Sequence, residues 1–203
     1  MLLCDIGNTS YHFQDNAHDF KKSVTAFNPS SITEQVYYIC VNSSVQKKIN
    51  TLDNWIDLKS NVDMSSYYET MGVDRIFACE AIQNGVIVDA GSAITVDVVK
   101  DGKFQGGFIY PGIKAMSKTY ADISPALTYS FNFDLDLTVL PKNSQDAISY
   151  GFLKPLYLEV ISHEMEIFLT GGDALEFTKI FLNAEVDETL IFKGMRKIFK
   201  SAL

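Results

Sequence analysis

The chain has 203 residues, of which 47% are hydrophobic, and its formal net charge is −8. This length and apolar content suit one large folded domain or two small ones. The negative charge argues against binding to nucleic acid or to an anionic membrane, because both need a basic face. We find no apolar run long enough to cross a bilayer and no leader-like start, so we expect a cytoplasmic protein.

The cysteines Cys4, Cys40 and Cys79 each lie in an apolar segment, without C-x-x-C spacing. We expect buried thiols in a reducing cytoplasm, and neither disulfides nor a zinc site. The three histidines show no metal-ligand spacing with one another and are expected to be ordinary strand or surface residues.

Two stretches of the chain share one pattern. An apolar strand runs into Asp5-Ile6-Gly7, and another runs into Asp89-Ala90-Gly91; a second strand follows each. Glycine lets a bulky anion approach the backbone, whose N–H groups bind phosphate oxygens, and a carboxylate beside it suits a bridging cation. Two ordinary hairpins would look the same by chance. The sharper interpretation is a duplicated fold whose two hairpins face each other across a nucleotide.

The region after the first hairpin alternates strands and helices. Ser31 to Glu34 matches a capping box for a short helix, and Asn42 caps another helix. The polar stretch 59–70 is expected to be a loop carrying Tyr67 and Tyr68, for which loop packing is the simpler alternative to function. The expected strands here are 19–25, 36–41 and 55–58.

Gly72-Val73-Asp74-Arg75 opens a helix with apolar residues at helical spacing. Asp74 therefore falls in the first turn, where the macrodipole favours an acid. Simple stabilisation of the helix would explain Asp74, but the ionised carboxylate is also the form that a general base needs. The spacing does not decide between the two.

The second half starts with the hairpin at Asp89 and continues into a strand with two internal glycines at 106–107. The Gly171-Gly172 turn after a strand at 166–169 is suited to an anion or a nucleotide edge. Residues 189–193 are expected to form a strand that ends at Gly194. Helices are expected at 113–123, from Asn143 to about residue 163, and at 195–202.

We therefore expect an α/β protein of two mixed-sheet halves, 1–85 and 86–203, with a cleft between them. Neither the P-loop pattern nor G-x-G-x-x-G occurs, which disfavours a P-loop or Rossmann site.

An ordered set of short motifs resembles the type III pantothenate kinases of bacteria, which have the duplicated actin-like (ribonuclease H-like) fold of acetate and sugar kinases, heat-shock chaperones and actin. Each motif alone is weak, but they occur in the family's order over nearly the whole chain. The matching motifs are Asp5-Ile6-Gly7-Asn8-Thr9, Gly72-Val73-Asp74-Arg75, Asp89-Ala90-Gly91-Ser92-Ala93-Ile94-Thr95, Gly106 to Gly112, Asn143-Ser144 with Ala147, Ile148 and Gly151, and Thr170-Gly171-Gly172.

The resemblance implies roles for particular residues. Asp74 would take the proton of the primary hydroxyl of pantothenate, and the aromatic residue beside this substrate would be Tyr67 or, as we prefer, Tyr68. Asp89 would bind a monovalent cation, K⁺ or NH₄⁺, and Asp5 would lie near the Mg²⁺ or other divalent metal that accompanies ATP. The implied ATP-binding residues are Asp5, Ile6, Gly7, Asn8, Thr9, Ser10 and Ser92, and the implied substrate-binding residues are Tyr68, Gly72, Val73, Asp74, Arg75 and Ser144.

The implied activity is the ATP-dependent phosphorylation of pantothenate to 4′-phosphopantothenate, the first step of coenzyme A biosynthesis, by a homodimer. Phosphoryl transfer requires mainly positioning and charge neutralisation, and an acidic protein achieves this through bound cations. One alternative is a non-catalytic nucleotide-binding regulator on the same fold. Another is an enzyme acting on a different small substrate, such as a sugar or acetate kinase or a polyphosphate-cleaving phosphatase.

Overall fold

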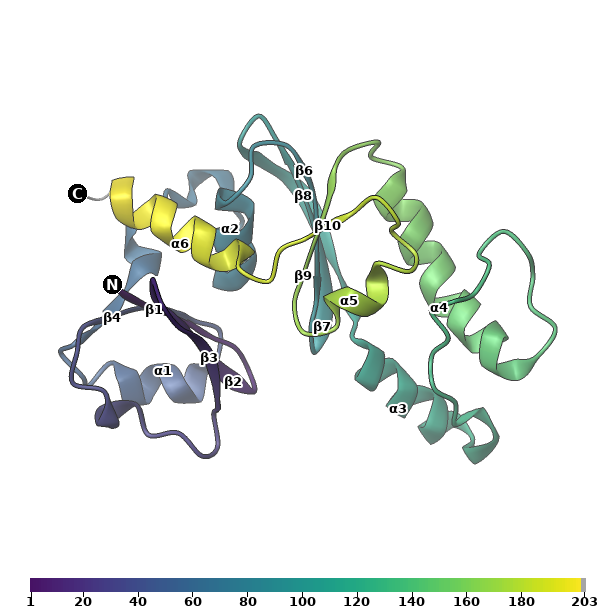
Figure 1. The fold of residues 1–203 in the computed structure, drawn as a ribbon, viewed down its shortest axis with the longest axis horizontal. Coiled ribbons are helices and arrows are strands. Elements are labelled where there is room, and N and C mark those ends of the chain that lie inside the picture. Colours follow the sequence, from purple (N-terminus) through teal and green to yellow (C-terminus); the bar gives the residue numbers. More distant parts are fainter. Residues whose placement is uncertain (202–203) are drawn as a thin grey trace. The chain divides into compact units, whose positions relative to one another are not determined.

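The computed structural model describes residues 1–201 and divides the chain into two compact units (Figure 1). The first unit comprises Met1–Ile82 and the C-terminal segment that starts at Thr189, and the second comprises Gln83–Glu188. Each unit contains one five-stranded mixed sheet, as the sequence predicts. The C-terminal segment, however, groups with the first unit and not with residues 86–188.

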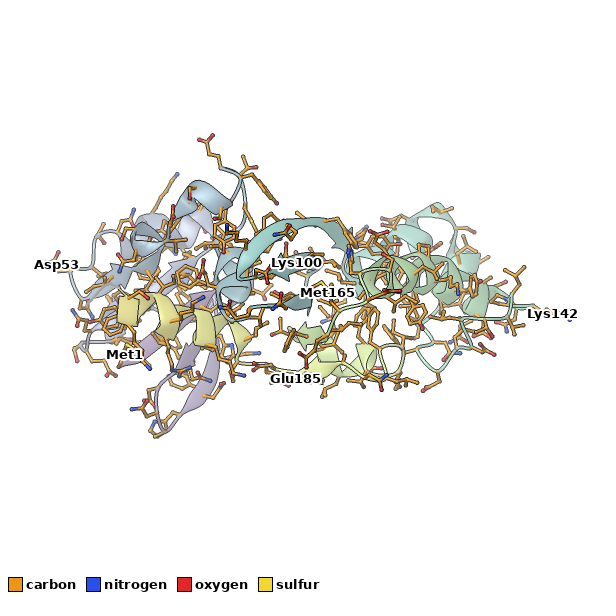
Figure 2. The ribbon with its side chains drawn as sticks, turned by 90° about the horizontal axis from the view of Figure 1, so that it is seen from above. Met1, Asp53, Lys100, Lys142, Met165 and Glu185 are labelled. Carbon is orange, nitrogen blue, oxygen red and sulfur yellow. The ribbon has the colours of Figure 1, made fainter. Side chains whose placement is uncertain are left out.

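The sheet of the first unit has the strand order β3-β2-β1-β4-β5. The first three strands pair antiparallel, while β1, β4 and β5 run parallel. The carboxyl ends of these three parallel strands therefore lie at the same end of the sheet. Met1 comes just before β1 and Asp53 comes just before β5, and both lie toward the opposite end of this unit in Figure 2. The strands are β1 (Leu2–Ile6), β2 (Ser10–Gln14), β3 (Asp19–Ser23), β4 (Val36–Cys40) and β5 (Trp55–Asp57).

Helices cover both faces of this sheet. Helix α1 (Ser43–Ile49) buries Val45 and Ile49 in the same cluster as alternate residues of β1 and β4. Helices α2 (Val73–Glu80) and α6 (Leu190–Ser201) lie side by side. The ring of Phe192 in α6 meets His12 of β2 at a centroid distance of 4.8 Å, which places α6 on the sheet.

Two local predictions for the first unit are wrong. Ser31 to Glu34 forms no helix, because Asn28 instead caps the short 3₁₀ turn η1 (Pro29–Ser31) and Ile32 is already extended. Segment 189–193 is not a strand but the start of α6. An added Cβ at Gly194 would meet the carbonyl oxygen of Phe77, so this glycine permits the close approach of α6 to α2 and does not mark a turn.

The predicted loop 59–70 includes two short 3₁₀ turns, η2 (Leu58–Asn61) and η3 (Met64–Ser66), each capped by an aspartate side chain. Asp57 accepts from the amide of Lys59, and Asp63 accepts from the amide of Ser65. These caps order the segment that carries the two tyrosines.

The second unit has the strand order β10-β9-β6-β7-β8. Its core packs one face of β6 and β7 against α4 (Ser144–Ile161) and α5 (Ala174–Phe177), and α3 (Ile113–Ile123) has the predicted bounds. Within this unit, Figure 2 shows Lys142, before α4, at one end and Lys100, Met165 and Glu185 at the other. The strands are β6 (Gly85–Ala90), β7 (Ala93–Lys100), β8 (Lys103–Pro111), β9 (Ile167–Thr170) and β10 (Glu185–Val186); η4 (Pro125–Leu127) follows α3.

Two further sequence predictions concern the burial of the cysteines and the absence of a membrane-spanning segment. None of these three cysteines forms a disulfide bond; Cys4 and Cys79 are buried, but Cys40 is only partly buried. In residues 1–201, none of the helices combines the length and the apolar character that crossing a membrane requires.

Candidate active site

The turn between β1 and β2 is the first predicted phosphate-binding element. Asp5 lies partly buried near the end of β1, whereas Asn8 and Thr9 at the tip are exposed. The amide of Gly7 donates to the carbonyl of Ser10 at 3.0 Å, which closes the turn. The turn thus presents an exposed tip next to a carboxylate, as an anion–cation site requires.

Three hydrogen bonds hold the carbonyl groups of this turn. The amide of Val41 donates to the carbonyl of Ile6 and the amide of Val24 to that of Thr9, both at 3.0 Å. The third donor is a side chain: Nδ2 of Asn42 lies 3.3 Å from the carbonyl oxygen of Asn8. The turn is therefore fixed by the residues that directly follow β4 and by the segment after β3.

A pocket of about 390 Å³ lies at the carboxyl ends of β4 and β5. Ligands of open α/β sheets bind at this edge of the strands. Burial, with the charges of Asp57 and Asp5 as lesser causes, raises the pKa of the Cys40 thiol to about 11, so the thiol is neutral and weakly reactive. The pocket is lined by Cys40, Val41, Asn42, Ser43, Gln46, Asp57, Lys59 and Val73.

The predicted acceptor motif begins α2, adjacent to this pocket through Val73. Gly72 is the N-cap and has no side-chain cap, and the carboxylate of Asp74 accepts from the amide of Arg75 at 2.8 Å. An added Cβ at Gly72 would lie 2.5 Å from Oδ1 of Asp74, so glycine leaves space for that carboxylate. Burial raises the pKa of Asp74, and the Arg75 amide and charge only partly oppose this effect. The result is a carboxylate that accepts a proton more readily than an exposed aspartate does.

The tyrosine loop places Tyr68 and Tyr67 in different surroundings. The hydroxyl of Tyr68 accepts from Nη1 of Arg75 at 2.6 Å, and the Arg75 guanidinium lies 5.9 Å from the Tyr68 ring centroid. The hydroxyl of Tyr67 instead donates to Oε1 of Glu80 at 2.8 Å, and Glu80 also accepts from Lys197 of α6. Tyr68 joins the acceptor motif, whereas Tyr67 anchors the loop to the helices.

In the second unit, Asp89 lies near the end of β6 between two threonines. It is the cross-strand partner of Thr95 on β7 and of Thr170 on β9. Cross-strand partners project on the same face of a sheet. The Oγ1 atom of Thr95 is buried and has no hydrogen-bond partner in the part of the chain that the structure describes. An added Cβ at Gly171 would meet Oδ1 of Asp89, so the turn after β9 closes tightly over the carboxylate.

Ser92 and Ser144 also belong to the second unit. Ser92 is exposed at the tip of the hairpin between β6 and β7, and its carbonyl lies against Gly112, where an added Cβ would collide with it. Ser144 is exposed in the first turn of α4, and the side chain of the N-cap Asn143 accepts from the amide of Asp146 at 2.9 Å. Each serine is therefore held at a capped or tightly packed turn.

The structure brings some predicted residues together and adds others. Tyr68, Asp74 and Arg75 form one group in the first unit. The other three predicted residues, Asp89, Ser92 and Ser144, belong to the second unit. Asn42 was predicted only as a helix cap, and Thr95 was predicted only as part of a family motif. Their contacts depend on strand register, which local sequence patterns do not reveal.

The chain is similar to known proteins over its whole length. The family model described as type III pantothenate kinase matches residues 30–162. A type III pantothenate kinase of Sulfurimonas denitrificans is 64% identical over 202 residues, covering 100% of this chain and 98% of that protein.

Solved structures also resemble the chain. A Campylobacter jejuni protein described as a Baf family transcriptional activator has a TM-score of 0.89 and 38% identity, covering 100% of this chain and 98% of that one. A Sinorhizobium meliloti protein described as a 2-dehydro-3-deoxygalactonokinase has a TM-score of 0.56 at 8% identity, covering 99% and 98%. At that identity the likeness concerns the fold alone. The sequence match and the motif order show that the chain belongs to the type III pantothenate kinase family.

Proposed function

We propose that this chain transfers the γ-phosphoryl group of ATP to the primary hydroxyl of pantothenate, which yields 4′-phosphopantothenate and opens coenzyme A biosynthesis. Membership of the type III pantothenate kinase family supports this activity. The observation that carries the assignment to a site is the partly buried Asp74 carboxylate, whose pKa is raised and which lies next to the Tyr68–Arg75 pair.

Asp74 acts as the general base in this proposal. Its carboxylate accepts the hydroxyl proton of pantothenate as the new oxygen–phosphorus bond forms, while the bond between the γ-phosphorus and the bridging oxygen of ADP breaks. A raised pKa helps, because a base is most effective when its pKa approaches the working pH. Arg75 and Tyr68 hold the acceptor in place, and Gly72 leaves space for the carboxylate.

The β1–β2 turn binds the nucleotide phosphates, and Asp5 supplies a carboxylate oxygen for the accompanying divalent metal. Ser92 is a further residue that we propose to contact ATP. Within residues 1–201, no cluster of three or more His, Cys, Asp or Glu side chains could hold a metal by itself. Mg²⁺ usually takes one or two protein carboxylates together with substrate phosphates, and Asp5 is the carboxylate we propose. When bound, the metal neutralises charge on the transferring phosphoryl group.

Asp89, Thr95 and Thr170 are the residues we propose for a monovalent cation, K⁺ or NH₄⁺. A buried threonine hydroxyl without a hydrogen-bond partner, on the same face as a carboxylate, is what an oxygen-ligated cation would satisfy. The cation would offset the negative charge of Asp89 and thereby help to order the turn at Gly171.

We propose a homodimer as the active form. None of the side chains of α3 is fully buried in the single chain, and Ile109 on the neighbouring β8 and Ile123 at the end of α3 are 64% and 67% exposed. Apolar side chains left exposed on adjacent elements are typical of a subunit interface. Sedimentation velocity at assay concentration tests this: a fully active monomer would contradict it.

A nucleotide-binding regulator is the second candidate, favoured by one observation: the similar Campylobacter jejuni structure is described as a transcriptional activator. The net charge of −8 disfavours direct contact with DNA. A regulator also has no need for a base beside a substrate pocket.

A coupled ADP-release assay tests the proposed function. We expect turnover with pantothenate and none above background with acetate or a panel of sugars. Turnover with a sugar or acetate alone would assign another kinase activity, and ATP binding without any turnover would favour the regulator.

A further inference from the structure

Asn42 uses its two side-chain atoms for two different tasks. Its Oδ1 accepts from the amides of Ser44 and Val45 at 3.1 and 3.2 Å and so caps α1. Its Nδ2 donates to the carbonyl oxygen of Asn8 at 3.3 Å, thirty-four positions away in the chain. The cap would be satisfied by oxygen alone, so the amide nitrogen needs a separate explanation.

The bond to Asn8 sets the direction of one peptide group. In a trans peptide the C=O and the following N–H point in opposite directions. Because Asn42 binds the carbonyl of Asn8 from one side, the N–H of the exposed Thr9 points to the other side. This is the kind of backbone donor that meets phosphate oxygens.

The carbonyls of Ile6 and Thr9 in the same turn accept instead from backbone amides, those of Val41 and Val24. Both donors are backbone N–H groups, so exchanging the side chain of Val41 or Val24 for another does not in itself remove the donor. Of these three bonds, the one from Asn42 is the bond that a change of side chain can remove.

We infer that Asn42 is a positioning residue for nucleotide binding: it orients the Thr9 N–H of the β1–β2 turn toward the ATP phosphates. This rests on the proposed function only in taking that turn as the phosphate site. Since Asn42 also lines the pocket that reaches Val73, it links the nucleotide turn to the neighbourhood of the acceptor motif.

The two tasks of Asn42 are separable by substitution. Serine and aspartate are about as good N-caps as asparagine. Asn42→Ser keeps a capping oxygen but is too short to reach Asn8, and Asn42→Asp keeps the length but lacks the donor. Agreement between a neutral and a charged variant excludes an effect of charge alone. Ser44→Ala is the matched control, because it removes a hydroxyl that donates to Oδ1 of Asn42 at 2.7 Å and leaves Nδ2 intact.

The full-length variants are compared by thermal melting, by steady-state kinetics and by calorimetric titration with ATP. We expect Asn42→Ser to melt close to wild type, with the KM and Kd for ATP raised about two- to tenfold, the cost of one lost hydrogen bond. The KM for pantothenate should stay unchanged, and Ser44→Ala should match wild type in all of these quantities.

Unchanged ATP binding in both Asn42 variants would overturn the inference. So would a parallel rise of both KM values together with a lower melting temperature, because that is the pattern of a purely structural residue. The calorimetric Kd keeps the two proposals apart: wild-type protein that binds ATP but never phosphorylates pantothenate contradicts the proposed function, while the comparison of ATP affinities still decides the role of Asn42.

Discussion

Nη1 of Arg75 donates a hydrogen bond to the hydroxyl of Tyr68 at 2.6 Å, although Arg75 is 4% exposed and Tyr68 is 44% exposed. The bond ties a buried cation at the start of α2 to an aromatic side chain that solvent reaches. Asp74, between Val73 and Arg75 in sequence, shares this group of residues. This hydrogen bond holds the tyrosine loop close to Asp74, the proposed base.

Tyr68→Phe should raise the KM for pantothenate with little change in the KM for ATP, because it removes the hydroxyl that meets Arg75 and keeps the ring. The expected loss is at most about 1.5–3 kcal/mol of binding free energy, the range for a hydrogen bond with a charged donor. Tyr67→Phe is the matched control: it removes the bond to Glu80 and should act mainly on stability. The assignment of Tyr68 fails if Tyr67→Phe alone changes the KM for pantothenate.

The Asp89 site makes activity depend on the monovalent cation. We expect rates to fall steeply when K⁺ or NH₄⁺ is replaced by Na⁺ or a bulky organic cation at matched ionic strength. Thr95→Val keeps the shape of the side chain and removes a hydroxyl that has no hydrogen-bond partner among residues 1–201, so it should weaken K⁺ activation without lowering stability. Asp89→Asn should lower both the rate and the K⁺ dependence. Equal rates in K⁺ and Na⁺ for the wild type would exclude the cation site.

Gly194→Ala should destabilise the first unit, because the added methyl group meets the carbonyl of Phe77 and forces α6 away from α2. Overpacking of this kind costs about 1–3 kcal/mol, measurable by denaturant unfolding. Gly151→Ala in α4 is the control, since nothing lies within 4 Å of its added Cβ, and it should gain up to about 1 kcal/mol from helix propensity. If the Gly194 variant matched wild type, the close packing of the two helices would not be a constraint.

Asp74→Asn should change stability in a pH-dependent way. Burial raises the pKa of Asp74 above its ordinary value of 3.8, so the folded state disfavours the ionised form. Below about pH 4 the carboxyl is protonated in both the folded and the unfolded state, and wild-type stability is lost as the pH rises through the raised pKa. The Asn variant should therefore gain in melting temperature relative to wild type as the pH rises from about 4 to neutrality.

The competing view of Asp74 as a residue that merely stabilises the helix N-terminus gives the opposite sign. A carboxylate that interacts favourably with the macrodipole makes the wild type the more stable protein at neutral pH. Melting curves of the two proteins across this pH range distinguish the two roles.

Local patterns predicted the elements whose signals lie within a few neighbouring residues. The bounds of α3, the cap of α1 by Asn42 and the start of α2 at Gly72 follow from such signals, and the structure confirms them. The prediction of a strand before Gly194 is wrong, because a glycine required for helix packing has the same local signature as a glycine in a turn. Only the distant Phe77 distinguishes the two cases.

Local sequence patterns were equally unable to predict the long-range contacts of the candidate active site. Sequence spacing identified Asp74 but left Tyr67 and Tyr68 unresolved, because both lie in one polar loop. Their separate contacts, with Glu80 and with Arg75, depend on how the loop folds back on α2. The pairing of Asp89 with Thr95 likewise depends on strand register.

The most direct test of the account is the turnover number of Asp74→Asn with saturating pantothenate and ATP. The amide is nearly isosteric and still accepts from the Arg75 amide, so calorimetry should show pantothenate binding close to wild type. Because the amide cannot take the hydroxyl proton, kcat should fall by about 10²–10⁴-fold. If the variant binds pantothenate and keeps more than about half of the wild-type kcat, Asp74 is not the base and the proposed mechanism is wrong.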